Sequence, residues 1–264
     1  MWMSLTLSVA IGLIPSQSAE LMLTKVRTTY GILGAERPSN KILPGDNVVL
    51  SFNLEGAKVD DNGRLRYSIG MEVSNADGKV LFRQAPRDVE TTVKPGAKSI
   101  PACASIQVGM DQPPGEYKLK VVVTDTAGGA TQEVSRTYEL LPKAFGLVKV
   151  SATTDREAQT PAGVLAQSKS AWINFSAVGF ARGDANGQPN IKFAMQVLDE
   201  SGNSALARSP SGEVNKDIPD KAHAVPGQFE LILKKPGKYK IELKATDAVA
   251  NQTATVTFPV TVAK

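Results

Sequence analysis

The fold is decided by a stretch that occurs twice in the chain, PGEYKLKVVVTD at residues 114–125 and PGKYKIELKATD at residues 236–247. Successive side chains of a β-strand point to opposite faces, so the first copy places Tyr117, Leu119 and Val121 on one face and charged residues on the other. A strand with one apolar and one charged face is typical of an antiparallel sheet with one side in water. Pro-Gly before the strand and Thr-Asp after it are turn signals. Each copy therefore predicts a strand between two turns.

Other parts of the chain repeat as well. Residues 63–78 align without a gap onto residues 187–202, an offset of 124, and the strand that begins at Tyr117 matches the one that begins at Tyr239 at an offset of 122. Short strands separated by turns, about seven in each unit, are the pattern of a β-sandwich. We predict an all-β chain of two tandem immunoglobulin-like antiparallel β-sandwich domains related by internal duplication, residues 20–141 and 142–264.

The individual strands can be placed from the same alternation and turn signals. In the first unit they are expected near residues 23–33, 47–54, 65–75, 79–83, 103–109, 116–124 and 131–140. In the second unit they are expected near residues 146–154, 171–178, 190–198, 203–207, 227–233, 238–246 and 253–262. Residues 84–101 and 208–226 are rich in proline and charge, which favours loops or a short edge strand.

Charge and composition limit the function classes. The net charge is +4, and residues 142–264 carry all of it, with 15 basic and 11 acidic residues against 15 and 15 in residues 19–141. This surplus is too small to indicate nucleic-acid binding. The chain has one histidine, His223, and one cysteine, Cys103, so an internal disulfide and a clustered-thiol zinc site are excluded.

The first 19 residues have the features of a signal peptide. An apolar run from Leu5 to Ile14 ends at Pro15, and small residues follow it up to Ala19. The run is too short to span a membrane, and the usual basic residue before it is missing. We therefore expect export, to the periplasm or the cell exterior.

The segments 114–140 and 236–262 carry a family resemblance. Gly-x-Tyr-x-Leu/Ile, then Thr-Asp, a turn of small residues and a Thr/Val-rich strand, resembles the last two strands of bacterial immunoglobulin-like, fibronectin-III-like and cadherin-like repeats. The resemblance implies an extracytoplasmic module for display, adhesion or spacing, and it is a likeness of fold. It also implies a buried tyrosine whose hydroxyl hydrogen-bonds to nearby backbone.

Catalytic and metal-binding signals are weak. A Ser-His-Asp or Cys-His system would have to use His223, which lies in a segment with loop character and without a nucleophile motif. Asp60 and Asn62 before Gly63 align with Asp184 and Asn186 before Gly187, and oxygen ligands at alternating positions begin many calcium loops. The same residues form ordinary turns, which is the interpretation we favour. We expect no catalysis, no cofactor and no metal.

One surface has a distinct charge. Five lysines crowd the second copy of the repeated stretch, and alternation predicts that those of the strand point outward: Lys234, Lys235, Lys238, Lys240 and Lys244. Such a face could meet an acidic polymer or lipid headgroup, or it could keep an edge strand soluble and unpaired.

The sequence thus favours a non-catalytic binding, adhesion or scaffold module of the cell envelope. One alternative is a carbohydrate- or ligand-binding accessory protein of an envelope enzyme system. A second alternative, which the sequence favours less, is a hydrolase with a site between the repeats. The partner is expected to be a protein or an envelope polymer and not a nucleic acid.

Overall fold

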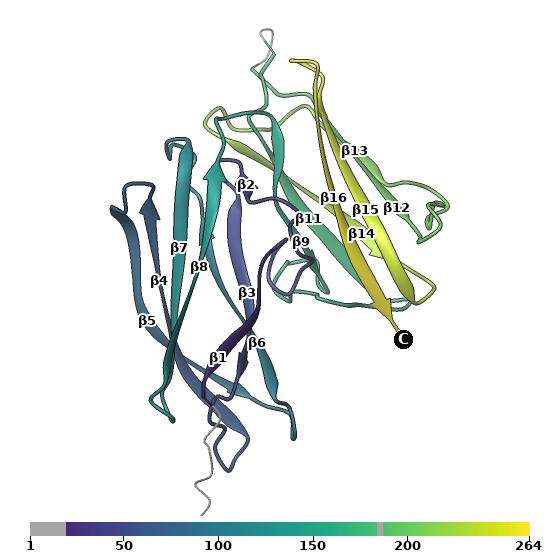
Figure 1. Ribbon diagram of the computed structural model, residues 1–264. Coiled ribbons are helices and arrows are strands. Elements are labelled where there is room, and N and C mark those ends of the chain that lie inside the picture. Colours follow the sequence, from purple (N-terminus) through teal and green to yellow (C-terminus); the bar gives the residue numbers. More distant parts are fainter. Residues whose placement is uncertain (1–19, 184–186) are drawn as a thin grey trace, which may run out of the picture.

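The chain is described here by a computed structural model that places residues 20–183 and 187–264. The sequence expectation of an all-β sandwich is confirmed, since these residues form strands and loops without a helix. Figure 1 shows two groups of strands next to each other, one drawn purple to teal and the other green to yellow.

Eight strands make up the first half, residues 20–141. They are β1 (Met22–Thr29), β2 (Lys41–Ile42), β3 (Asn47–Glu55), β4 (Arg64–Asn75), β5 (Val80–Thr92), β6 (Ser99–Gln107), β7 (Gly115–Asp125) and β8 (Thr131–Leu140). One layer is a three-stranded sheet in the order β1-β3-β6, and the other is a five-stranded sheet in the order β2-β8-β7-β4-β5. The pair β2-β8 is parallel and the others are antiparallel.

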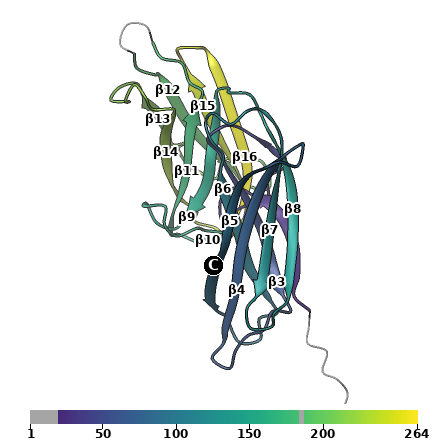
Figure 2. The ribbon, with the colours of Figure 1, turned by 90° about the vertical axis from the view of Figure 1, so that its left-hand side faces the viewer.

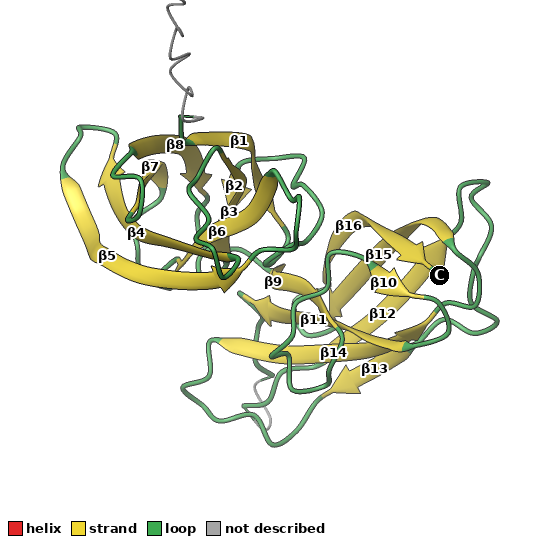
Figure 3. Cartoon of the chain, turned by 90° about the horizontal axis from the view of Figure 1, so that it is seen from below, coloured by secondary structure: helices red, strands yellow, loops and turns green. Residues whose placement is uncertain are grey.

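The second half, residues 142–264, has the same arrangement. Its strands are β9 (Gly146–Thr153), β10 (Leu165–Ala166), β11 (Ser170–Val178), β12 (Ile191–Leu198), β13 (Ser211–Val214), β14 (Ala224–Ile232), β15 (Gly237–Asp247) and β16 (Gln252–Ala263). The sheet orders β9-β11-β14 and β10-β16-β15-β12-β13 follow those of the first half strand for strand. In the view of Figure 3 each half appears as strands wrapped around its own interior. The shared topology supports a duplication, which remains our proposal together with the domain limits.

Each half has its own hydrophobic core between its two sheets. In β7 the expected alternation buries Tyr117, Leu119, Val121 and Val123, and these pack against residues of β3 such as Phe52. Ile241, Leu243 and Ala245 of β15 are buried in the same way. Both tyrosine hydroxyls bond to nearby backbone as the family resemblance implies: that of Tyr117 donates a 2.6 Å hydrogen bond to the carbonyl of Pro113 and that of Tyr239 a 2.9 Å bond to the carbonyl of Lys235. The Tyr117 ring is buried as expected, but the Tyr239 ring is only half-buried.

The structure corrects several predicted strands. β5 does not end near residue 83 but continues to Thr92 as an edge strand, through a segment expected to form loops or a short edge strand. The ladder slips where Ala85 and Pro86 face Gly70, and such a bulge breaks the alternation by which a strand is predicted. β6 begins at Ser99 and β14 at Ala224, earlier than expected, because both are edge strands, which tolerate Pro101 and Pro226. Residues 203–207 do not form a strand.

The two halves meet at a joint to which the loop after β1 and the loop between β2 and β3 both contribute. Tyr30 leaves the first half and packs against the core of the second, with its ring 5.5 Å from that of Phe258. Gly146 leaves space for Leu43 at the start of β9, since a Cβ at this position would overlap the leucine. The two halves thus have separate hydrophobic cores, and side chains of the first half pack directly against the second half at the joint.

A buried carboxylate holds this joint together. One oxygen of Asp46 accepts hydrogen bonds from the backbone N–H groups of Asn47, at 2.8 Å, and of Lys149 in the second half, at 2.7 Å. The other oxygen accepts a 2.8 Å bond from the guanidinium of Arg37, which lies over the Tyr30 ring. Charge-assisted bonds of this kind are among the stronger hydrogen bonds in proteins, and here they link Arg37 and Asn47 of the first half to Lys149 of the second through one carboxylate.

Candidate functional site

The five lysines named from the sequence form one exposed surface, here called the lysine face: Lys234, Lys235, Lys238, Lys240 and Lys244. Burial of Ile241 and Leu243 on the inner side of β15 forces Lys238, Lys240 and Lys244 outward, as predicted. Lys234 and Lys235 lie in the turn between β14 and β15, where the Tyr239 hydroxyl bonds to Lys235.

The position of β15 changes one interpretation of the lysine face. β15 lies between β16 and β12 and is bonded to both, so it is a central strand of its sheet. Lysines that protect a sheet against edge-to-edge pairing belong on an edge strand. Edge protection therefore does not explain Lys238, Lys240 and Lys244, which project from the middle of the outer surface.

Next to the lysines stands a row of exposed threonines. In the β15-β16 ladder Thr261 faces Lys238 and Thr255 faces Lys244. Glu242 supplies a carboxylate on the same strand face, with Thr257 opposite. Within the part of the chain that the structure describes, no carboxylate lies within 4.0 Å of any amine of the lysine face. Their charges are thus directed to solvent.

The corresponding surface of the first half is neutralised by ion pairs. Lys120 contacts Glu133 at 2.8 Å, and Arg83 contacts Glu72 at 2.6 Å. The hydrogen bond from Lys120 lowers the pKa of the Glu133 carboxyl, and the pKa of Lys120 is raised in turn. At the offset of 122, Lys120 corresponds to Glu242 and Glu133 to Thr255, so neither member of this ion pair is kept in the second half.

Only two of the four candidate calcium ligands, Asp60 and Asn62, lie among the described residues. Asp60 lies in a turn, where one carboxylate oxygen accepts 2.9 Å hydrogen bonds from the backbone N–H groups of Asn62 and Arg64. The Arg64 bond is the main cause that lowers the pKa of Asp60. This is the turn geometry that we favoured. Asp184 and Asn186 lie outside the described residues, and the residues that are described bring no three potential metal ligands together.

Two buried aspartates close equivalent turns in the two halves. Asp125 accepts hydrogen bonds from the backbone N–H groups of Lys58, Ala127 and Gly128 at 2.7–3.0 Å. Asp247 makes the same three bonds in the second half. The Thr-Asp pairs therefore cap turns within their own halves, and their carboxylates are occupied.

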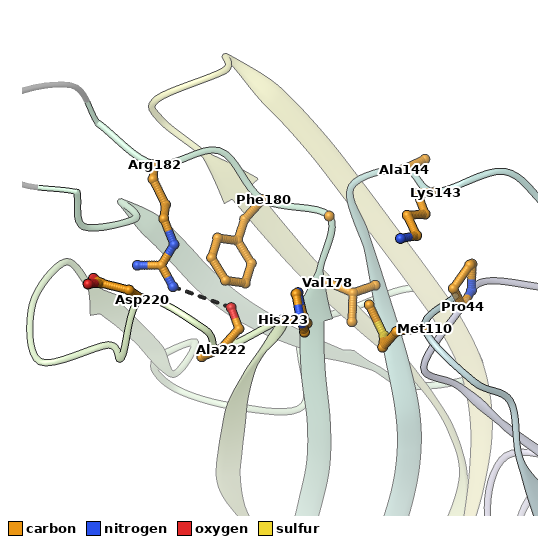
Figure 4. Close-up of a pocket in the computed structure, with 11 residues that line it drawn as sticks. Pro44, Met110, Lys143, Ala144, Val178, Phe180, Arg182, Asp220, Ala222 and His223 are labelled. Carbon is orange, nitrogen blue, oxygen red and sulfur yellow. Dashed lines mark hydrogen bonds between the residues drawn. The ribbon is translucent and has the colours of Figure 1, made fainter. Parts of the chain in front are cut away.

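His223 lies at a small cavity of about 200 Å³ beside the joint, shown in Figure 4. Met110, Val178 and Phe180 line its apolar side. The cavity is smaller than the roughly 300–1,000 Å³ of common ligand pockets. Two of its cationic groups are engaged with the protein itself. Arg182 donates 2.7 and 3.3 Å hydrogen bonds to the carbonyls of Pro219 and Ala222, and Lys143 pairs with Asp111 at 2.8 Å. No acid-base pair is assembled among the residues that line it.

The remaining side chains with chemical potential are occupied or enclosed. Cys103 is half-buried in β6, and this burial raises the pKa of its thiol. Trp172 is half-buried, with the guanidinium of Arg156 5.6 Å from its ring centre, so it does not offer a bare stacking platform. Sequence reasoning missed the Asp46 joint, because its partners lie up to 103 residues apart and share no local pattern.

Searches against known proteins found no matching family profile and no matching curated protein. Similar solved structures include the transglutaminase of red sea bream, with 10% identity and a TM-score of 0.29 over 93% of this chain and 31% of that one. The β-glucuronidase of Bacteroides uniformis is similar over 82% of this chain and 26% of that one, with 10% identity and a TM-score of 0.36. The C-terminal domain of the AgI/II polypeptide BspA of Streptococcus agalactiae is similar over 89% of this chain and 99% of that one, with 10% identity and a TM-score of 0.29.

These similarities do not assign a function. The chain spans less than a third of the length of the transglutaminase and of the glucuronidase, and the TM-scores are all low. Among the described residues there is no helix of the length and apolarity that a membrane crossing requires. The all-β sandwich assignment rests on the strands and sheets of the structure itself.

Proposed function

We propose that this chain is a non-catalytic binding module of an exported envelope protein, and that its lysine face binds an acidic polysaccharide. The observation that carries the proposal is the unpaired charge of the lysine face on a central strand, where the equivalent surface of the first half is ion-paired. Export rests on the apolar run in residues 1–19, which lies outside the described residues.

The geometry of the lysine face fits a linear polymer. Residues two apart on a strand are separated by about 6.7 Å, so the amines of Lys238, Lys240 and Lys244 are spread along roughly 20 Å of β15. The threonines of the adjacent β16 offer hydroxyl groups that can hydrogen-bond to sugar hydroxyls along the same line. A chain of negatively charged sugars could therefore contact several lysines and threonines at once.

The composition of this surface argues against other polyanions. The outward positions of β15 and β16, both described in full, hold lysine, glutamate, threonine and proline and no aromatic ring. Single-stranded nucleic acids are usually bound through stacking on aromatic side chains. Binding at a lipid surface usually includes large apolar side chains that enter the membrane, and the outward positions of these strands offer no apolar side chain larger than that of Pro259.

The test is retention on immobilised heparin, a carboxylated and sulfated polysaccharide, at low salt. The variant Lys238→Thr/Lys240→Thr/Lys244→Thr keeps β-branched residues on the strand and removes three charges. The control variant removes three strand lysines from the first half, Lys41, Lys118 and Lys120, also replaced by Thr. We expect the lysine-face variant to elute at much lower salt than the parent and the control variant to elute close to the parent, because exposed charges act within a Debye length of about 8 Å.

Two outcomes would contradict the proposal. Equal losses of retention in both triple variants would mean that only net charge matters. Unchanged retention of the lysine-face variant would leave these lysines as residues for solubility. Circular dichroism of each variant verifies that the strands are intact.

A further inference from the structure

A second surface, on the first half, has the features of a protein-docking site and is independent of the lysine face. β5 is the last strand of its five-stranded sheet, bonded to β4 on one side, and its other side meets no strand among the described residues. In Figure 2 it lies beside β4 at the border of the sheet. The strand has thirteen residues and is exposed along most of its length.

Three consecutive large apolar side chains are exposed at the start of β5. Val80, Leu81 and Phe82 have exposed fractions of 40%, 50% and 42%. The register places Val80 opposite Ser74, on the outer side of the sheet, and Phe82 opposite Val73, on the core side, while Leu81 sits in a bulge between them. Exposed apolar side chains therefore lie on both faces of the sheet at this edge. They form one cluster, unlike the single exposed apolar residues that are scattered over most protein surfaces.

The second half shows that the fold does not require this exposure. At the offset of 124 the three residues correspond to Ser204, Ala205 and Leu206. No strand forms there, although the N–H of Ala205 bonds to the carbonyl of Val197 in β12, and Ala205 and Leu206 pack half-buried against the core. The first half therefore exposes three apolar side chains on a strand at a position where the second half has two half-buried ones.

Charge around the three apolar residues, here called the β5 patch (Val80, Leu81 and Phe82), indicates the kind of partner. Residues 79–87 contain three cations, Lys79, Arg83 and Arg87, and no acidic residue. Glu72 pairs with Arg83, and no carboxylate of the described residues lies within 4.0 Å of Lys79 or Arg87. A ligand that combines apolar side chains with carboxylates is complementary to this surface.

We propose that the β5 patch binds a short extended segment of a partner protein in which apolar and acidic residues alternate. A second copy of this chain fits less well, because pairing two β5 starts would bring Lys79 and Arg83 of one copy against the same cations of the other. Pairing further along would place Pro86, which has no N–H, in the centre of the new ladder. The bulges at Leu81 and at Ala85-Pro86 likewise disfavour a long ladder, so side chains and not backbone bonds supply most of the recognition.

The probe is a fluorescein-labelled synthetic peptide in which glutamate alternates with valine or phenylalanine. Its binding is measured by fluorescence anisotropy at low salt. The control peptide has lysine at every glutamate position. The test variant is Leu81→Ser/Phe82→Ser, and the matched control is Val164→Ser/Val249→Ser, which alters two exposed apolar residues of the second half. We expect the acidic peptide to bind the parent and the matched control alike, and the β5 variant about tenfold more weakly, as loss of an apolar anchor entails.

The lysine-face triple variant separates this site from the proposed polymer site, because it should bind the peptide as the parent does. Binding that is lost in the lysine-face variant and kept in Leu81→Ser/Phe82→Ser would overturn the β5 proposal, as would equal binding of the acidic and basic peptides or no binding to the parent. A concentration-dependent dimer in sedimentation that Leu81→Ser/Phe82→Ser abolishes, without peptide binding, would assign the patch to a second copy and also refute the proposal.

Discussion

Replacement of Asp46 by alanine should lower the free energy of unfolding more than replacement of any exposed acidic residue near the joint. Asp46 is buried, with its side chain 3% exposed, and its partner Arg37 is 13% exposed. Removing the carboxylate leaves a guanidinium with little access to water and without its counter-charge. Breaking a buried pair from one side costs about 3–5 kcal/mol in other proteins.

Two further hydrogen bonds are lost in the same variant. The N–H groups of Asn47 and Lys149 lose their acceptor, and each unsatisfied group costs about 1–3 kcal/mol when it stays dry. Both residues border a cavity of about 210 Å³ that also reaches Asp46, so water can enter and replace part of the loss. We therefore expect Asp46→Ala to lower the free energy of unfolding by about 3–4 kcal/mol, near the lower end of the range for buried pairs.

The assay is urea unfolding at neutral pH, followed by far-UV circular dichroism. With a slope of about 2 kcal/mol per molar urea, the expected loss moves the midpoint by roughly 1.5–2 M. Asp111→Ala is the control, because Asp111 also pairs with a lysine near the joint but its side chain is 91% exposed. An exposed pair contributes about 0–1 kcal/mol. A difference between the two variants below about 0.5 kcal/mol would refute the reasoning, since it would mean that the buried pair adds nothing to its own desolvation.

The other predictions concern elements that both halves share. Asp125→Ala and Asp247→Ala each remove the acceptor of three backbone N–H groups. Each substitution should therefore lower the free energy of unfolding of its own half by about 3–5 kcal/mol, measured by urea unfolding. A loss below about 1 kcal/mol would show that other contacts hold the turns. Tyr117→Ala should cost about 3–5 kcal/mol, because the ring is 5% exposed and stacks on that of Tyr138. Tyr239→Ala should cost less, since this ring is only half-buried, and the reverse order of denaturation midpoints would contradict the prediction.

The central strands could be predicted from the sequence because their burial is one-sided. In β7 and β15 the inner side chains are buried and the outer ones are in water, so the pattern of Tyr117, Leu119, Val121 and Val123 follows directly from the packing. The tyrosine hydroxyl bonds were implied by the family resemblance, and the turn at Asp60 was predictable from its residue types. In each case the partners lie within a few residues along the chain.

The edge strands and the joint could not be predicted in this way. β5 has little buried surface, and its two bulges shift the alternation, so its sequence resembles a charged loop. The strand β13 is only four residues long. The direction in which the lysines of β15 point was predictable, but the place of β15 in the sheet order was not, because strand order depends on contacts between residues far apart in the sequence.

The way in which the two halves differ supports a binding role for the lysine face. The outward positions of β7 and β8 carry a net charge of −1, and the corresponding positions of β15 and β16 carry +2, which accounts for three of the four charges by which the halves differ. Solubility alone would not require that these changes share one surface. Beneath that surface the buried Asp125 and Asp247 make the same three bonds. The buried aspartates therefore hold equivalent turns in both halves, while the outer charges differ: Lys120 and Glu133 form an ion pair in the first half, and Glu242 and Thr255 stand at the corresponding positions of the second. A sandwich that keeps its frame and concentrates unpaired cations on a central strand has the properties that binding to an anionic polymer requires.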